Sequence, residues 1–547
     1  GLISSLVKPT YFATPENQWA TLLHPHMPSW IAPSDVDGSI TLFFKGVPAG
    51  GEIPWGVWAV PMLWWVLLFG VLAFSAMCIS VILRKQWVEN ERLRFPILEP
   101  VLAMTEGWES DRPWPEFARG RLFWIGGSVA FVYIFWNSLS WISPIFPKLP
   151  VRGRLFSFFG RDTPGMFTYV DPFTFSFSYF ANLEILFSVW FFFAAFMVEF
   201  GTFNRLGYSI GRRGDRAGSY DAASSWQSLG AFCVFVLFGL WMARRHLKDV
   251  VKQAWRPATG KGEDRELVSY RTAVFGVVVG LVFTIVWLNR AGMDYQLALP
   301  LVGMMLILYI GVARIIAEAG LLYVSGPMTA QTFSVYLLGA KSVSPSSLVA
   351  LQFSYLTNSG VSSLGRMAHI TKASESIRDS GRRLFGAVAL AFLVTTCFMT
   401  FLTLYVGYTQ GAENCSRWTV HTILDTVSKI KDPFVTDWKR IRFFWIGAAV
   451  MAVLMLLRYR LPWWPLHPVG FTIMATDLVR NFALTLFLAW ACKWLILKVG
   501  GITLYRRAQP LFLGLLAGHV LGIAAAFLVD MFLFPGAGHM IHPWIQT

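Results

Sequence analysis

The stretch from Leu297 to Tyr323 is 27 residues long and apolar, yet it carries two ionisable side chains, Arg314 and Glu318. A helix of this length extends about 40 Å and can therefore cross a bilayer. An arginine or a carboxylate far from the helix ends costs about 2.5–3.5 kcal/mol on insertion scales. The i,i+4 spacing places both side chains on one helix face, where their charges can neutralise each other. Two interpretations follow: a structural ion pair that locks helices together, or one wall of a polar cavity that binds a solute.

The composition extends this conclusion to the whole chain. Hydrophobic residues occupy 55% of the 547 positions, charged residues only 14%, and the mean hydropathy is +0.52. Tryptophan doublets such as Trp64-Trp65 and Trp463-Trp464 stand at the ends of apolar runs, as an interfacial aromatic belt requires. We therefore predict an all-α, polytopic transmembrane bundle of about 10–12 spans with broken or re-entrant helices, in contact with membrane lipids.

Charge and hydropathy divide the chain into an extracytoplasmic segment at 1–53, an N-terminal transmembrane half at 54–289 and a C-terminal half at 290–547. The chain begins with Gly1, and we expect that its true N-terminus is missing. The net charge of +15 is gathered in short loops beside apolar runs, which indicates membrane topology and no nucleic-acid partner. The expected spans are 54–83, 122–142, 172–203, 226–243, 271–289, 297–323, 384–408, 443–457, 467–499 and 511–534.

The basic loops also constrain orientation. Lysine and arginine are concentrated in 84–121, 244–271 and 366–383, so we place these loops in the cytoplasm. Three spans between the first two loops conflict with this placement, because an even number of crossings is required. The conflict disappears if 172–203 and 467–499 are broken hairpins that return to the side they entered. The alternative is that 226–243 does not cross.

The two long spans also resemble each other. One begins Asp171-Pro172 and the other His467-Pro468, and an ionisable residue follows each proline by twelve positions. These residues, Glu184 and Arg480, would lie about 18 Å along a helix, near the bilayer midplane. Paired interrupted segments in the two parts of a chain are typical of transporter binding sites. The alternatives are a pseudo-repeat and a chance likeness of two Phe- and Pro-rich stretches.

The intramembrane charges form the candidate site. Two positive and two negative residues can cancel in one cavity, which suits a small zwitterion. A helix break is expected between Gly320 and Pro327, where a half-helix end would present backbone groups to a ligand. Asn481 is a further neutral hydrogen-bonding candidate. The predicted substrate-binding residues are Glu184, Arg314, Glu318, Arg480, Asn182 and Tyr323.

The sequence lacks H-E-x-x-H and Walker A patterns, and no G-x-S-x-G stands in the strand-to-helix context that a nucleophilic serine requires. The five cysteines show no C-x-x-C spacing, so we expect neither a disulfide framework nor a metal site. The prediction is a non-enzyme without a cofactor. A membrane-embedded enzyme using Glu318 or Glu184 as acid or base is the weaker alternative.

Five segments carry a resemblance to a known family: Tyr11–Asn17, Arg84–Glu89, Arg94-Phe-Pro96, Arg314–Gly320 and Trp463–Gly470. They resemble an uncharacterised, domain-of-unknown-function family of bacterial polytopic membrane proteins. A remoter likeness to the oligopeptide-transporter superfamily implies proton-coupled uptake.

The resemblance and the site together predict a multi-pass protein of the bacterial inner membrane that carries a small zwitterionic or peptide-like solute. The alternative is a non-transporting structural or accessory subunit, with other membrane subunits or a homo-oligomer as partners.

Overall fold

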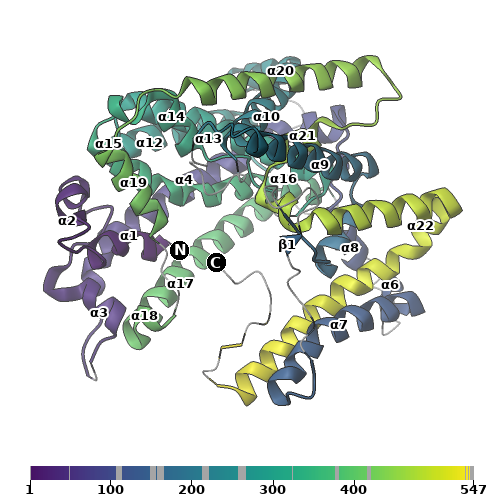
Figure 1. Cartoon of the computed structure of the whole chain (residues 1–547), viewed down its shortest axis with the longest axis horizontal. Helices are drawn as coiled ribbons and strands as arrows, with labels where there is room; N and C mark the ends of the chain where they lie inside the picture. Colours follow the sequence, from purple (N-terminus) through teal and green to yellow (C-terminus); the bar gives the residue numbers. More distant parts are fainter. Residues whose placement is uncertain are drawn as a thin grey trace. The chain divides into compact units, whose positions relative to one another are not determined.

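The computed structural model describes the chain except for residues 1, 49, 106–113, 148, 150–154, 157–164, 212–220, 257–266, 323, 376–380, 416–419, 536–537, 540 and 542–547. Helices dominate the described part (Figure 1). The strands there are β1 (Leu155–Phe156) and β2 (Met166–Phe167), which pair antiparallel. The predicted all-α class is confirmed.

The chain divides into two compact units, each assembled from three separate stretches. Unit 1 comprises Gly1–Arg92, Val236–Ala313 and Met328–Ile441, and unit 2 comprises Leu93–Phe235, Arg314–Pro327 and Arg442–Thr547. Neither unit is a continuous half of the sequence. The topological division at residues 53 and 289 stays a prediction.

Unit 1 is built on α4 (Trp55–Lys85), which packs against α12 (Tyr270–Arg290). Gly276 and Gly280 of α12 permit this approach, because Cβ atoms there would collide with Phe74 and Ser75 of α4. The other helices are α1 (Leu2–Tyr11), α2 (Trp19–Leu22), α3 (Ser39–Lys45), α11 (Arg244–Trp255), α14 (Ala330–Leu338), α15 (Pro345–Ser354), α16 (Val361–Ala373), α17 (Gly381–Gln410), α18 (Ala412–Cys415) and α19 (His421–Lys431).

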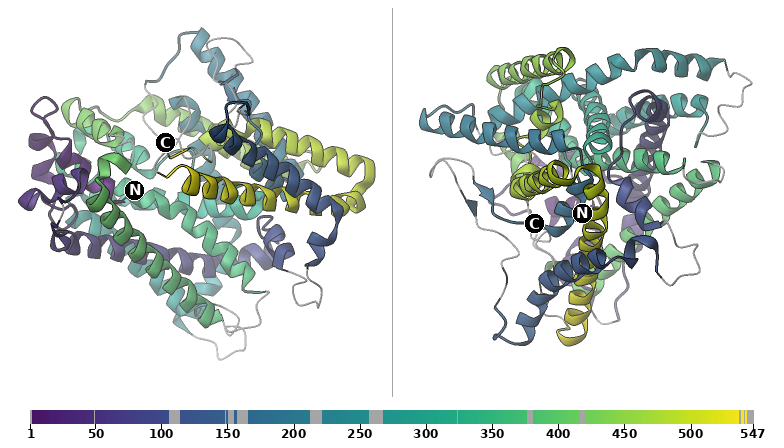
Figure 2. Two further views of the ribbon diagram at one scale, coloured as in Figure 1. Left: turned by 90° about the horizontal axis from the view of Figure 1, so that it is seen from below. Right: turned by 90° about the vertical axis from the view of Figure 1, so that its right-hand side faces the viewer.

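Unit 2 is built on α22 (Asp477–Leu533), a long helix that bends sharply at Gly501, where φ is +59°. Its second arm runs beside α7 (Arg121–Ile142), as two views show (Figures 1 and 2). Gly514 and Gly518 of α22 face the backbone of α7 without room for a side chain, so the two helices pack closely through small residues. The unit also contains α5 (Leu98–Thr105), α6 (Glu116–Arg119), α8 (Pro172–Phe180), α9 (Leu183–Arg205) and α21 (Pro468–Ile473).

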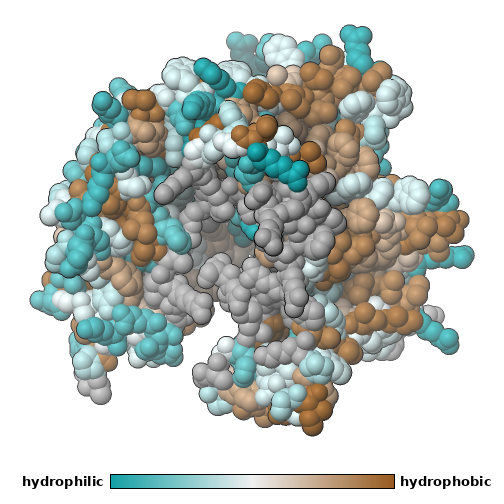
Figure 3. Space-filling model, in the orientation of Figure 1, coloured by the Kyte–Doolittle hydropathy of each residue, from teal (hydrophilic) through white to brown (hydrophobic). Residues whose placement is uncertain are grey.

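Three further helices, α10 (Ala222–Met242), α13 (Tyr295–Ala319) and α20 (Trp438–Arg460), continue from one unit into the other along the chain. Nine helices of the described residues are long and apolar enough to cross a membrane. One of them is α22, whose two arms correspond to two of the predicted spans. The polytopic membrane architecture is therefore confirmed. Hydrophobic residues also gather on the surface over α22 (Figure 3).

The expected interruptions also occur. The 172–203 span is divided into α8 and α9 at Ala181 and Asn182, and the 467–499 span is divided into α21 and α22 at 474–476. The segment after Pro96 forms the eight-residue helix α5, which is too short to cross. The helix α9 after the first break, however, qualifies as a span by its own length and composition, so the hairpin interpretation of 172–203 is not required. The sidedness of the loops stays a prediction.

Candidate functional site

Arg314 and Glu318 lie in the last two turns of α13. The guanidinium Nε of Arg314 is 3.9 Å from Oε2 of Glu318, and the two side chains are only 17% and 21% exposed. The guanidinium carbon of Arg314 also lies 5.3 Å from the ring centre of Phe235. Both side chains therefore lie mainly against protein, and the i,i+4 ion pair expected from the sequence is present.

The helix ends directly after this pair. The last helical residue is Ala319, and Gly320 adopts a φ of +70°, the left-handed conformation typical of a helix C-terminus. The amide of Gly320 donates to the carbonyl of Ile316 at 3.0 Å. The predicted break between Gly320 and Pro327 is confirmed.

The segment Arg94-Phe95-Pro96 packs on this helix end. The amide of Phe95 donates to the carbonyl of Ala317 at 3.0 Å, which satisfies one of the last backbone acceptors of α13. A Cβ atom on Gly320 would lie 2.5 Å from Cβ of Pro96. Two segments that are far apart in the sequence therefore make a close backbone contact. Because this contact leaves no room for a side chain, glycine is required at position 320.

His467 brings a further ionisable group to Glu318. Its Nε2 lies 3.1 Å from Oε1 of Glu318, while its Nδ1 accepts a hydrogen bond from the amide of Val469 at 3.3 Å. Because Nδ1 acts as an acceptor, the ring proton is on Nε2, and the imidazole donates it to the carboxylate. His467 is thus both the N-cap of α21 and the hydrogen-bond donor to Glu318.

Glu184 belongs to the same group of charges through Arg458. An oxygen of Glu184, near the start of α9, lies 3.0 Å from a terminal nitrogen of Arg458 in α20. The charge of Arg458 also acts electrostatically on Glu318, without a direct ion pair between them in the described residues. Asn182 is the N-cap of α9, because its side-chain oxygen accepts from the amide of Glu184 at 3.0 Å. The site therefore contains two carboxylates, two guanidinium groups and one imidazole.

The two broken helices pack against each other in a crossed manner. The first short helix, α8, packs on α22, and the second short helix, α21, packs on α9. The backbone amide of Asp171 before α8 donates to Oγ1 of Thr485 in α22 at 3.2 Å. The backbone amide of His467 before α21 donates to Oγ of Ser188 in α9 at 2.6 Å. The sequence likeness of the two segments is thus matched by reciprocal contacts.

The remaining predicted residues lie as follows. The guanidinium carbon of Arg480 is 5.1 Å from the ring centre of Phe167 in β2, and its convergence with the other three charges stays a prediction. Asn481 is half-buried in α22. Tyr323 lies outside the described residues.

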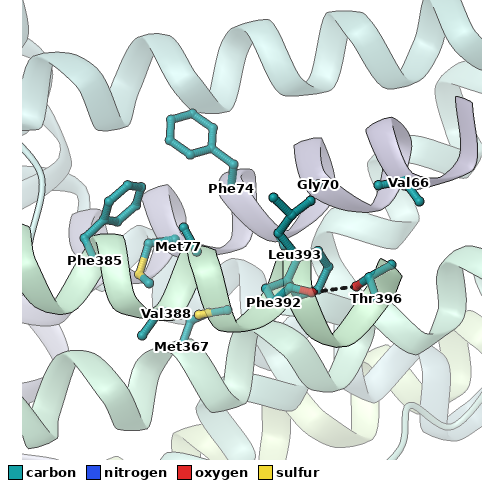
Figure 4. A pocket seen from close by; sticks show the side chains of 12 residues that line it. Val66, Gly70, Phe74, Met77, Met367, Phe385, Val388, Phe392, Leu393 and Thr396 are labelled. Carbon is teal, nitrogen blue, oxygen red and sulfur yellow. Dashed lines mark hydrogen bonds between the residues drawn. The ribbon is translucent and has the colours of Figure 1, made fainter. Parts of the chain in front are cut away.

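A cavity in unit 1 has a different character. It measures about 220 Å³ and lies along α4 and α17, where Phe74, Met77 and Phe392 are among the lining side chains (Figure 4). Its lining is almost entirely apolar. It therefore offers little to a charged solute, and the ionisable cluster of unit 2 is the better candidate site.

Comparison with protein-family models identifies the family of this chain. Residues 1–541 match the model of the family described as "Family of unknown function (DUF6785)". The chain belongs to this family. A search of curated proteins gives no match.

Three polar groups of this DUF6785 member were missed by sequence reasoning. In the sequence, His467 is only the residue before Pro468 at the beginning of a long span, and Arg458 is only a basic residue directly after the apolar run 443–457. Lys493 stands within an apolar run of α22 and is buried, with its ammonium beside the break between α8 and α9. The signal that could have found Lys493 is its isolated charge within a predicted span.

Proposed function

We propose that this membrane protein is a secondary transporter that binds a small zwitterionic or peptide-like solute at the charges around Glu318 and His467. The observation that carries the proposal is the crossed packing of the two broken helices, with His467 at the start of one and Glu184 just after the break of the other. Discontinuous helices in pairs surround the solute and ion sites of secondary transporters. We expect it to act in a bacterial inner membrane.

The charges of the cluster favour a zwitterion over a simple ion. Arg314 and Arg458 offer guanidinium donors that match a carboxylate, and Glu184 and Glu318 offer acceptors that match an ammonium group. The positive and negative charges balance, so the cluster has no net charge when no solute is bound. A solute with both charges would replace internal ion pairs with equivalent contacts and leave the balance unchanged.

A binding screen on the purified protein tests the proposal. The probes are the twenty common amino acids and a set of dipeptides, and the readout is the melting temperature, which rises when a ligand binds the folded state. At least one probe should stabilise the wild type but not Glu318→Gln. The control is Glu375→Gln, which removes an exposed carboxylate that pairs with Arg84 in unit 1 and should leave the response intact.

A panel in which no probe stabilises the wild type would contradict the proposal and favour the accessory-subunit alternative. The same holds for a probe that stabilises the wild type and Glu318→Gln equally, because that probe binds elsewhere.

A further inference from the structure

A buried lysine occupies the break in the first interrupted helix. Lys493 lies in the first arm of α22, and its Nζ donates to the carbonyl oxygens of Tyr179 at 2.8 Å and Ala181 at 2.6 Å. These carbonyls end α8, and α9 begins immediately after them. Both distances are short, as expected for charge-assisted hydrogen bonds.

Two aromatic rings complete the surroundings of the ammonium group. Its Nζ lies 4.9 Å from the ring centre of Tyr505 and 5.9 Å from that of Tyr179. The two rings stack on each other with centres 4.8 Å apart, and the hydroxyl of Tyr179 donates to the carbonyl of Tyr505 at 2.9 Å. Ring faces attract a cation, so carbonyls and rings together form a cage for one positive charge.

Such a cage has a known role in carriers. Unwound backbone carbonyls and half-helix C-terminal ends are the groups that coordinate a coupling Na⁺ or proton in transporters with discontinuous helices. Here the ammonium of Lys493 occupies the place of that cation. Unlike a metal ion, an ammonium can lose its charge by releasing a proton, and a lysine does so more readily in surroundings of low dielectric constant.

We propose that Lys493 is the coupling proton site of this protein. We further propose that its protonated amine holds the end of α8 and the start of α9 in place at the break. In the protonated state the ammonium binds the carbonyls of Tyr179 and Ala181. When the proton leaves Nζ, the neutral amine binds these carbonyls less strongly, and the end of α8 and the start of α9 become free to move at the break. The coupling role rests on the proposed transport function, but proton binding at Lys493 can be measured without any solute.

The charged and titratable neighbours of Lys493 come from three elements. Glu99 of α5 and Arg94 just before that helix both act electrostatically on Lys493, with opposite signs. Tyr179 belongs to α8, while Tyr505 and Cys492 belong to α22, as Lys493 itself does. Glu99 is exposed, and the proton that leaves Nζ passes to bulk water.

Hydrogen–deuterium exchange of the purified wild type, read on the peptide that covers Tyr179 to Glu184, tests this inference. After correction for the intrinsic pH dependence of exchange, protection should fall at least about tenfold between pH 7 and pH 10, because two charge-assisted hydrogen bonds weaken. The break at 474–476, where the sequence has no lysine, is the internal control and should keep its protection.

Variants distinguish a Lys493 that gains and loses a proton from a Lys493 that is always charged and only structural. In Lys493→Met, the peptide from Tyr179 to Glu184 should lack protection at every pH. In Lys493→Arg, the same peptide should keep its protection at every pH, because guanidinium does not titrate in this range. Lys498→Met is the matched control: Lys498 is exposed on the same helix and stacks on Trp494, so its removal should leave the wild-type pH dependence intact.

Wild-type protection that does not change with pH would overturn the inference, and so would Lys493→Met with wild-type protection at pH 7. The wild-type series decides the question even if the variants do not fold. Because no solute is present, a negative result here leaves the binding screen at Glu318 unaffected, and a negative screen leaves this result unaffected.

Discussion

The imidazole Nε2 of His467 donates to Oε1 of Glu318 across 3.1 Å, and this contact joins the start of α21 to the end of α13. The other ring nitrogen holds the first turn of α21 through the amide of Val469. A change in the hydrogen bonding of Glu318 would therefore reach the broken helix directly. Glu318 thus links the charged cluster to the first turn of α21.

Removal of one partner of the Arg314–Glu318 pair should cost more than removal of both. Glu318→Ala leaves the largely buried guanidinium of Arg314 without its carboxylate, a loss on the order of 3 kcal/mol. Arg314→Ala/Glu318→Ala removes the unpaired charge as well and should recover part of the stability. Melting temperatures and membrane-extracted yields of both singles and the double provide the measurement. Additive losses would show that the pair is not coupled.

Substitution of His467 can separate its two roles. Asparagine is a good N-cap but is too short to reach Glu318 from this position, so His467→Asn should keep the first turn of α21. His467→Ala should lose about 1 kcal/mol of cap energy in addition to the contact with Glu318. We expect His467→Asn to be more stable than His467→Ala by about this cap energy, and both variants to lose ligand stabilisation in the binding screen. Equal stability of both variants would argue against the capping role.

Gly320 should not tolerate a side chain. Gly320→Ala places a Cβ in a left-handed backbone conformation and 2.5 Å from Pro96, which together should cost about 2–4 kcal/mol. Gly303→Ala is the matched control on the same helix, because a Cβ there meets no atom within 4 Å and alanine favours helix. Thermal melts should show a clear loss for position 320 and no loss for position 303. Equal melting temperatures would mean that the Pro96 contact is absent.

Asp294 should make stability sensitive to acid. Hydrogen bonds from Ser344 and then Ser347, at 2.7 and 2.8 Å, hold the pKa of this carboxyl below its usual value. The folded pKa is thus lower than the unfolded one, so the stabilisation is complete above the unfolded pKa of about 4 and is lost as the pH falls through the folded pKa.

The effect at Asp294 should be small, because the side chain is exposed. Asp294→Asn should melt below the wild type at pH 7 and lose less on acidification toward pH 3. Ser344→Ala should show part of the same change. A variant with the acid sensitivity of the wild type would contradict this assignment.

The sequence predicted the long apolar helices well, because length and hydropathy determine them locally. It also predicted that the spans 172–203 and 467–499 are interrupted and that Asp171-Pro172 and His467-Pro468 begin them, but not the positions of the two breaks. The partners of the charges were harder to predict. Glu184 pairs with Arg458, which lies 274 positions later in the sequence, and only the fold brings the two together.

His467 was missed for a different reason. A histidine before proline carries no distinctive signal in the sequence, and its second nitrogen becomes informative only when Glu318 is placed beside it. Lys493 lacks the twelve-residue spacing that distinguishes Arg480, although both stand in the first arm of α22. Its signal in the sequence is a single charge within a predicted span.

Uptake by proteoliposomes tests the central claim most directly. Vesicles containing the wild type, Glu318→Ala or Glu375→Ala are incubated with the pooled amino acids and dipeptides, and the internal solutes are quantified by mass spectrometry. The wild type and Glu375→Ala should accumulate at least one zwitterion above empty vesicles, and Glu318→Ala should take it up at least about tenfold more slowly. No accumulation by the wild type, or equal uptake by Glu318→Ala, would contradict the account.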